Sequence, residues 1–163
     1  MNKVYYIMGV SGSGKSTIGK LLAQDLDIPF FDGDDFHPQQ NIQKMSEGKP
    51  LTDVDRQGWL ESLNKLAMAQ LKKNSCVIVC SALKQKYRDI LNNSLSDKTL
   101  WIHLQGSFDL IQKRVQRRAD HFMPTALLQS QFDILEKPKN AIEISVDLPP
   151  NKIIEIIKNQ PHE

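Results

Sequence analysis

The stretch Gly9-Val10-Ser11-Gly12-Ser13-Gly14-Lys15-Ser16 directly follows the apolar run Val4 to Met8. It spells the pattern GxxxxGK[ST], in which a glycine-rich turn directs several backbone N–H groups into one concavity. A helix that begins near Gly14 adds the positive end of its dipole, so a phosphate group is the natural occupant. We expect this loop and the adjoining Thr17 to hold a nucleoside triphosphate, with Lys15 on the β- and γ-phosphates and the Ser16 hydroxyl as a Mg²⁺ ligand.

Length and composition indicate one domain of ordinary size. The chain has 163 residues and a net charge of +2, so no broad field attracts nucleic acid or an anionic membrane. Cys76 and Cys80 share one strand-like run, which holds them too far apart for a disulfide, and we interpret both as buried thiols. The chain enters its first strand candidate at once, and no run approaches membrane-spanning length. We expect a cytoplasmic protein without nucleic-acid or membrane partners.

Apolar runs alternate with amphipathic segments along the chain. Runs that are apolar at every position are typical of parallel strands covered on both faces, and here they lie at 4–8, 29–31, 76–80 and 100–104. Residues 142–146 alternate with polar residues and predict an edge strand. Helical spacing predicts helices over 16–26, from 53 onward, and over 83–92, 107–118, 124–135 and 150–158, with Ser107 as an N-cap and Pro124 and Pro150 in first turns. The pattern predicts a three-layer α/β domain spanning residues 1–163.

One long segment breaks this periodicity. Residues 32–58 are rich in Asp, Gly, Pro and Lys and follow a predicted strand end, where open parallel sheets bind their ligands. We therefore expect an irregular insert that contacts a substrate. Asp32 and Asp34 stand two residues apart, so in extended backbone they point the same way and can share one site. We assign Asp34 to orienting or deprotonating an acceptor hydroxyl and Asp32 to the Mg²⁺ shell, and the two roles could be exchanged.

Other classes of phosphate-binding protein fit less well. A guanine-nucleotide switch needs an N-K-x-D motif, and Asn64-Lys65-Leu66-Ala67 lacks the aspartate. A motor ATPase needs a buried strand that ends in acidic residues, whereas the run 76–80 ends in Ser81-Ala82. Acids that follow a different strand instead favour phosphoryl transfer to a hydroxyl.

Four motifs in this order resemble the bacterial gluconate kinase family: GVSGSGKST, DGDDFHPQQNIQKMSEGKPLTDVDRQGWL, CSALKQKYRDIL and HFMPTALLQSQFDILEKP. The resemblance spans nearly the whole chain. It implies an adenylate- or shikimate-kinase-like P-loop fold with a five-stranded parallel sheet and a mobile lid. It also implies transfer of a phosphoryl group from ATP to D-gluconate, and a homodimer.

Carried over residue by residue, the resemblance implies a sugar-acid site with several polar members. These are Asp34, His37, Lys44, Arg56, Ser81, Lys84 and His121. The chemistry of such a site agrees, because a carboxylate needs a cation and Arg56 can bind one in a bidentate fork. Ser81 and Lys84 follow the strand 76–80 and should lie at the carboxyl edge of the sheet.

Three arginines cluster near the end of the predicted helix 107–118. Arg114, Arg117 and Arg118 share one helical face and precede Asp120. We expect a lid over about 117–126 that brings at least one guanidinium onto the γ-phosphate, with Arg118 as the catalytic candidate. The alternative is that arginines simply complement the dipole at a helix C-terminus. Asp120 stands where relatives often have glycine, and it could pair with a lid arginine.

Two rival functions remain from the sequence. A kinase of the same fold acting on shikimate or a nucleoside monophosphate is the nearest enzymatic rival. A nucleotide-binding sensor without turnover is the rival from another class, although a pure binder needs no acceptor-side acid such as Asp34.

Overall fold

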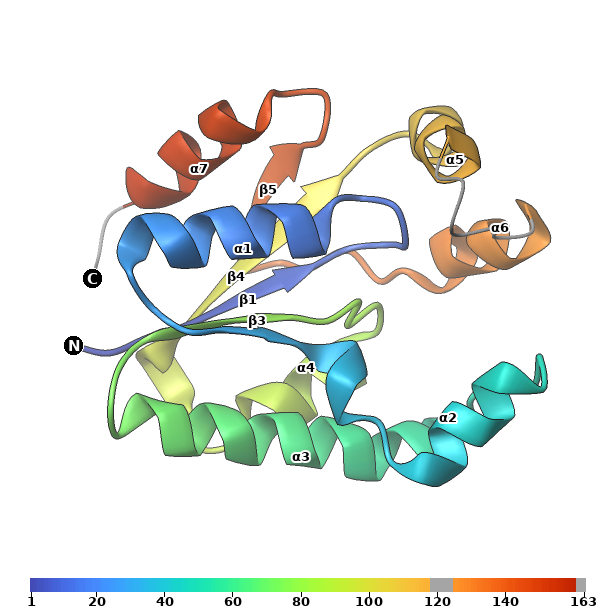
Figure 1. Cartoon of the computed structure of the whole chain (residues 1–163), viewed down its shortest axis with the longest axis horizontal. Coiled ribbons are helices and arrows are strands. Elements are labelled where there is room, and N and C mark those ends of the chain that lie inside the picture. The colour runs from blue at the N-terminus through green and yellow to red at the C-terminus, as the bar shows by residue number, and fades with distance from the viewer. Residues whose placement is uncertain (118–124, 161–163) are drawn as a thin grey trace.

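The structure is a computed structural model that describes residues 1–117 and 125–160. Its centre is a parallel sheet of five strands in the order β2-β3-β1-β4-β5 (Figure 1). The strands are β1 Val4–Met8, β2 Phe30–Asp32, β3 Cys76–Val79, β4 Thr99–Gln105 and β5 Ala141–Ser145. The predicted five-stranded parallel sheet is confirmed, and β5 does lie at an edge, paired with β4.

The central strand β1 is fully buried and runs parallel to both of its neighbours. All five residues of β1 are buried, and its neighbours start in line with it, since Val4 pairs with Cys76 of β3 and with Thr99 of β4. Parallel strands need helical crossovers that cover both faces, so each strand carries apolar residues on both sides.

Helices cover the two faces of the sheet in separate layers (Figure 1). One layer contains α1 Lys15–Leu26 and α7 Pro150–Lys158, and the other contains α3 Asp53–Leu71 and α4 Gln85–Asn92. Alternate residues of β1 separate accordingly: Ile7 packs into the α1 and α7 core, and Tyr6 into the α3 and α4 core. The remaining elements are α2 Gln39–Ser46, α5 Phe108–Arg117, α6 Thr125–Ile134 and the short 3-10 helices η1 Gly33–Phe36 and η2 Ser96–Lys98.

The prediction of an irregular insert over residues 32–58 is wrong. The segment contains η1, α2 and the first turns of α3, and only its connections are irregular. Periodicity missed α2 because its residues Ile42 and Met45 are exposed and it has one buried side chain, the polar Asn41. Asn41 donates a hydrogen bond to the Asp55 carbonyl oxygen at 2.9 Å, so a polar contact, not an apolar stripe, fixes this helix.

Local signals place the other helices close to their predicted bounds. Ser107 is the N-cap of α5, because its Oγ accepts from the Leu110 N–H at 3.2 Å, and Pro150 begins α7. Pro124 lies outside the described residues. Cys76 and Cys80 are buried free thiols, and burial raises their pKa values to about 12, so both are inert core residues.

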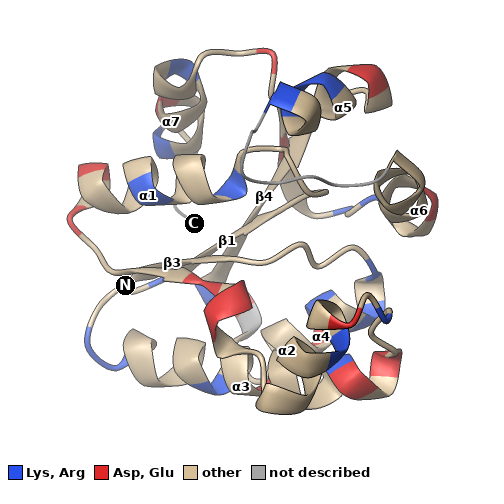
Figure 2. Cartoon of the chain, turned by 45° about the vertical axis from the view of Figure 1, so that its right-hand side comes forward, with Lys and Arg blue, Asp and Glu red and all other residues tan. Residues whose placement is uncertain are grey.

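Acidic and basic residues are distributed over several elements of the fold. Figure 2 shows both red and blue segments on the helices of the described residues. In the same part of the chain, none of the helices is both long and apolar enough to cross a membrane.

Candidate active site

The loop between β1 and α1 has the backbone that phosphate binding requires. Gly9, Gly12 and Gly14 have φ values of +151°, +81° and +92°, which side chains other than hydrogen rarely tolerate. A Cβ on Gly12 would lie 2.5 Å from Val115 Cγ2, so glycine also lets the loop pack against α5. Lys15 Nζ donates to the carbonyl oxygens of Gly9 and Val10, both at 3.0 Å, and its ammonium therefore lies over the start of the loop.

Ser16 and Asp32 meet at the carboxyl edge of the sheet. Ser16 Oγ donates to Asp32 Oδ2 at 3.1 Å, joining the first turn of α1 to the end of β2. Two hard oxygen ligands beside a phosphate loop fit Mg²⁺, which binds proteins through one or two such groups and otherwise keeps waters and phosphate oxygens. The residues present therefore suit the expected ion.

The two-residue spacing predicted that Asp32 and Asp34 share one stretch of extended backbone. This prediction is wrong for Asp34. It lies in η1, whose first turn is capped by Asp32: the Asp34 N–H donates to Asp32 Oδ1 at 3.0 Å. One oxygen of Asp32 therefore caps this turn while the other faces Ser16. The Asp34 side chain is 84% exposed and open to a second substrate. Reduced solvation at the site and the negative charge of Asp32 raise the pKa of Asp34.

His37 is packed beside Asp34. Its ring stacks on Trp59 with centroids 4.0 Å apart, and its Nε2 lies 3.9 Å from Asp34 Oδ1. Trp59 in turn donates from Nε1 to the Gly33 carbonyl oxygen at 2.7 Å, which fixes η1 on α3. Burial lowers the pKa of His37, so the imidazole is neutral at pH 7 and available for hydrogen bonding.

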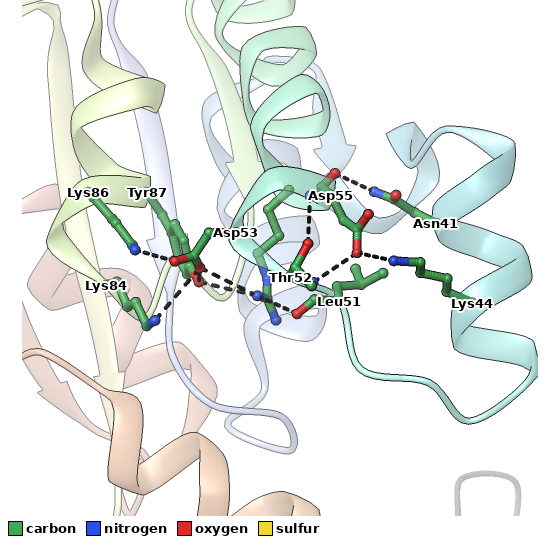
Figure 3. A network of polar contacts seen from close by, with 10 residues as sticks. Asn41, Lys44, Leu51, Thr52, Asp53, Asp55, Lys84, Lys86 and Tyr87 are labelled. Atoms are coloured by element: carbon green, nitrogen blue, oxygen red, sulfur yellow. Dashed lines mark hydrogen bonds and ion pairs between the residues drawn. The ribbon is translucent and has the colours of Figure 1, made fainter.

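Cationic side chains gather around Asp53 at the start of α3 (Figure 3). Asp53 Oδ1 lies 3.7 Å from Lys84 Nζ and 3.9 Å from Arg56 Nη1, and Asp53 Oδ2 pairs with Lys86. Tyr87 Oη donates to Asp53 Oδ1 at 2.5 Å. Hydrogen bonds from Lys86 and Tyr87 lower the pKa of Asp53 to about 2. The structure therefore brings Arg56 and Lys84 together, with one carboxylate between them.

Arg56 has further partners in this group. Its Nη1 donates to the Leu51 carbonyl oxygen at 2.9 Å and to Tyr87 Oη at 3.2 Å, and its guanidinium lies 5.4 Å from the centroid of the Tyr87 ring. These contacts hold the guanidinium plane in place, which suits a fork-like contact with a carboxylate.

Lys44 belongs to a separate group. Its Nζ lies 2.7 Å from Asp55 Oδ2, which also accepts from the Thr52 N–H at 2.9 Å (Figure 3). Lys44 and Thr52 lower the pKa of Asp55 to about 2. Thr52 and Asp55 form a capping box at the start of α3, so Lys44 ties α2 to this cap and does not join Arg56 and Lys84.

Ser81 lies where the β3 strand leads into α4, next to the phosphate loop. Its carbonyl oxygen accepts from the Gly9 N–H at 3.3 Å. The next residue, Ala82, has a φ of +46°, an uncommon value for a residue with a side chain. This turn carries Ser81 and Lys84 along the same sheet edge as Asp32.

A cavity of about 160 Å³ lies on the other side of the phosphate loop. Its lining includes Gly14, Thr17, Arg114, Leu148 and Pro150. Arg114 Nη2 donates to the Val146 carbonyl oxygen at 2.5 Å, which ties α5 to the turn before α7. Arg117 is the last residue of α5, whereas Arg118 and His121 lie outside the described residues, as does most of the predicted lid.

Sequence reasoning missed several members of this site. The acids Asp53 and Asp55 pair with the predicted cations, and the spacing Thr52 to Asp55 was a readable capping signal. Leu148 and Pro150 line the cavity, and Gln131 contacts the phosphate loop. The contact between Gln131 and the loop joins residues that are 120 positions apart, so no local sequence pattern predicts it.

Fold and site together define a P-loop kinase: a phosphate loop, a Ser–Asp oxygen pair and the exposed carboxylate of Asp34 share one edge of a parallel sheet. A family model for shikimate kinase matches residues 11–155. The thermosensitive gluconokinase of Escherichia coli K12 is 52% identical over 136 residues, covering 83% of this chain and 72% of that protein. The thermoresistant gluconokinase of the same organism is 42% identical over 164 residues, covering 95% and 93%. The chain belongs to the shikimate kinase family and, within it, to the gluconokinases.

A solved structure agrees with this assignment. The crystal structure of a gluconokinase from Sinorhizobium meliloti 1021 superposes with a TM-score of 0.84 at 40% identity, covering 94% of this chain and 87% of that one. The resemblance stated from the four sequence motifs is therefore confirmed.

Proposed function

We propose that this chain transfers the γ-phosphoryl group of ATP to D-gluconate, giving ADP and 6-phospho-D-gluconate. The observation that supports the proposal is the run of contacts from Ser16 through Asp32 to the exposed Asp34, which joins the end of the phosphate loop to the turn that holds this acid. The identity to curated gluconokinases supports gluconate as the acceptor.

On the donor side, the loop N–H groups from Gly12 to Thr17 and the Lys15 ammonium bind the phosphates. Lys15 stabilises the charge that develops on the transferring group. Ser16 and Asp32 would hold Mg²⁺, which when bound neutralises charge on the β- and γ-phosphates. The cavity beside Thr17 receives the nucleoside, between the apolar side chains of Leu148 and Pro150 and the Arg114 guanidinium.

On the acceptor side, Asp34 accepts the proton of the gluconate hydroxyl or orients it for attack. Its raised pKa moves it towards the range of a useful general base. His37, held neutral and fixed by Trp59, donates or accepts a hydrogen bond to a neighbouring hydroxyl. Arg56 and Lys84 bind the substrate carboxylate. Asp53, which lies close to both cations, then reduces the net positive charge around that carboxylate.

The remaining predicted residues have supporting roles in this scheme. Ser81 offers a hydroxyl at the sheet edge, and Lys44 acts from α2 through its pair with Asp55. Arg117, Arg118 and His121 belong to the proposed lid over about 117–126, which would exclude water from the γ-phosphate.

One experiment tests the proposal and its rivals together. ADP formation should be measured with ATP and Mg²⁺ against a panel of D-gluconate, other sugar acids, shikimate and nucleoside monophosphates. We expect gluconate to give the highest kcat/KM. Turnover on shikimate or a nucleotide but not on gluconate would overturn the substrate assignment, and ATP binding without turnover on any member would favour a sensor.

We also propose a cytoplasmic homodimer. Several large apolar side chains are exposed on the helices, among them Ile42, Met45 and Leu127, and a partner subunit would cover such groups. Light scattering coupled to size-exclusion chromatography gives the mass directly, and a monomer at assay concentrations would contradict this assignment.

A further inference from the structure

Gln131 on α6 makes a paired contact with the phosphate loop. The Ser11 N–H donates to Gln131 Oε1 at 2.8 Å, and Gln131 Nε2 donates to Ser11 Oγ at 3.0 Å. Both ends of the amide are therefore used on one residue. Such a two-point contact fixes orientation as well as distance, because rotating the amide would break both bonds.

This contact lies at the γ-phosphate end of the loop. The Lys15 ammonium, which in this motif reaches the β- and γ-phosphates, lies on the carbonyl oxygens of Gly9 and Val10. Ser11 is the next residue. The helix N-terminus that follows the loop directs further N–H groups at the bound phosphates. Gln131 therefore acts on the part of the loop closest to the transferring group.

The same segment of chain is anchored on the acceptor side. The Glu136 N–H donates to the Leu83 carbonyl oxygen at 2.8 Å, and Glu136 Oε1 accepts from the Gln85 N–H at 2.6 Å. The buried Arg88 donates to the carbonyl oxygens of Glu136 and Ala82, at 2.7 and 2.6 Å. The chain just after α6 is thus fixed to the turn that carries Ser81 and Lys84.

We propose that Gln131 is a positioning residue for phosphoryl transfer. It holds Ser11 at a set distance from the acceptor turn, because residues 131–136 bond the donor loop at one end and the β3–α4 turn at the other. This inference rests on the proposed kinase function. Gln131 contacts the loop and is not proposed to contact either substrate. Removing its side-chain amide should therefore slow the transfer step more than it weakens the binding of ATP or gluconate.

The test compares Gln131→Met with Gln129→Met. Methionine keeps the length of glutamine but removes both polar atoms, and Gln129 is an exposed residue of the same helix that bonds only locally, to Asp133 Oδ1 at 2.9 Å. We expect Gln131→Met to lower kcat by about tenfold or more, with KM for ATP and for gluconate within about threefold of wild type. Gln129→Met should leave all three constants unchanged, and both variants should keep the wild-type Tm.

A double-mutant cycle with Ser11→Ala isolates the Nε2–Oγ half of the contact, because alanine keeps the backbone N–H that donates to Gln131 Oε1. If the pair acts as a unit, Gln131→Met should cost a smaller factor in kcat in the Ser11→Ala background than in wild type. A kcat for Gln131→Met equal to that of Gln129→Met would overturn the inference, and two losses that simply multiply would overturn the part of it that concerns the Ser11 hydroxyl. Wild-type protein without gluconate-dependent ADP formation would instead count against the proposed function.

Discussion

Ser16 Oγ and Asp32 Oδ2 lie 3.1 Å apart, while the other oxygen of Asp32 accepts from the Asp34 N–H at 3.0 Å. One carboxylate therefore links the phosphate loop to the turn that holds Asp34, the acid that we propose acts on the acceptor. A substitution at Asp32 should affect both the contact with Ser16 and the cap on the turn that holds Asp34. Because a different oxygen makes each contact, the two effects can be separated.

Asp32→Asn should weaken Mg²⁺ binding. The amide keeps an oxygen that can cap η1 but loses the negative charge on the metal side. We expect the Mg²⁺ concentration for half-maximal activity to rise about tenfold or more, measured at saturating ATP and gluconate. Asp35→Asn, at an exposed acid in the same turn, is the matched control and should leave the Mg²⁺ dependence unchanged. Equal Mg²⁺ curves for both variants would remove Asp32 from the metal shell.

Asp34→Asn should lower kcat by about 10²-fold or more and leave ATP affinity nearly unchanged. The amide is nearly isosteric but does not accept the proton of the acceptor hydroxyl at neutral pH. The measurement is steady-state kinetics with both substrates varied, together with ATP binding by calorimetry. Near-normal turnover in this variant would exclude Asp34 from the mechanism.

The acid side of the pH–rate profile should report Asp34. Because its pKa is raised above the ordinary aspartate value of about 3.9, the active carboxylate is lost at a higher pH than for an unperturbed aspartate as the pH falls. We expect the acid limb of kcat/KM to have its midpoint above that of an unperturbed aspartate.

His37 and Asp32 face Asp34, and the lowered pKa of His37 makes it the competing source of such a limb. His37→Asn separates the two. A limb that persists in this variant supports Asp34, and one that disappears assigns the titration to His37.

Arg56→Lys should weaken gluconate binding. Lysine keeps the charge but loses the planar fork that contacts Leu51 and Tyr87 and that we assign to the carboxylate. We expect KM for gluconate to rise about tenfold or more with KM for ATP unchanged. Lys86→Gln is the control, since Lys86 shares the partner Asp53 but has no proposed substrate contact. A similar rise in both variants would assign the effect to disruption of the Asp53 group.

The Lys44–Asp55 contact should stabilise the fold above about pH 4 and lose this effect in acid. The Asp55 pKa is lowered to about 2 in the folded chain, chiefly by Lys44, against about 3.9 when unfolded. The contribution is therefore fully present above the unfolded value and disappears as the pH falls towards 2. Urea midpoints of wild type and Asp55→Asn should differ at pH 6 and converge by about pH 2. A pH-independent difference would contradict this reading.

Much of the fold could be predicted because its signals are local. The strands β1 and β3 are apolar at every position, since helices cover both faces of a parallel sheet, and Ser107 and Pro150 mark helix starts through their own backbone chemistry. The helix α2 escaped prediction for the opposite reason: a buried amide, Asn41, fixes it through a contact with α3, and a 3.6-residue apolar repeat is absent.

The loop Gly9 to Ser16 was determined by the sequence itself, because glycines at fixed spacing are what a phosphate-binding backbone requires, and the order of the motifs identified the family. Tertiary structure alone decided which charged groups meet. Arg56 and Lys84 converge on Asp53, Lys44 turns instead to Asp55, and Gln131 reaches Ser11 across 120 residues. These pairings form because parallel strands bring distant turns to one edge of the sheet, and no local sequence pattern predicts which of those turns come into contact.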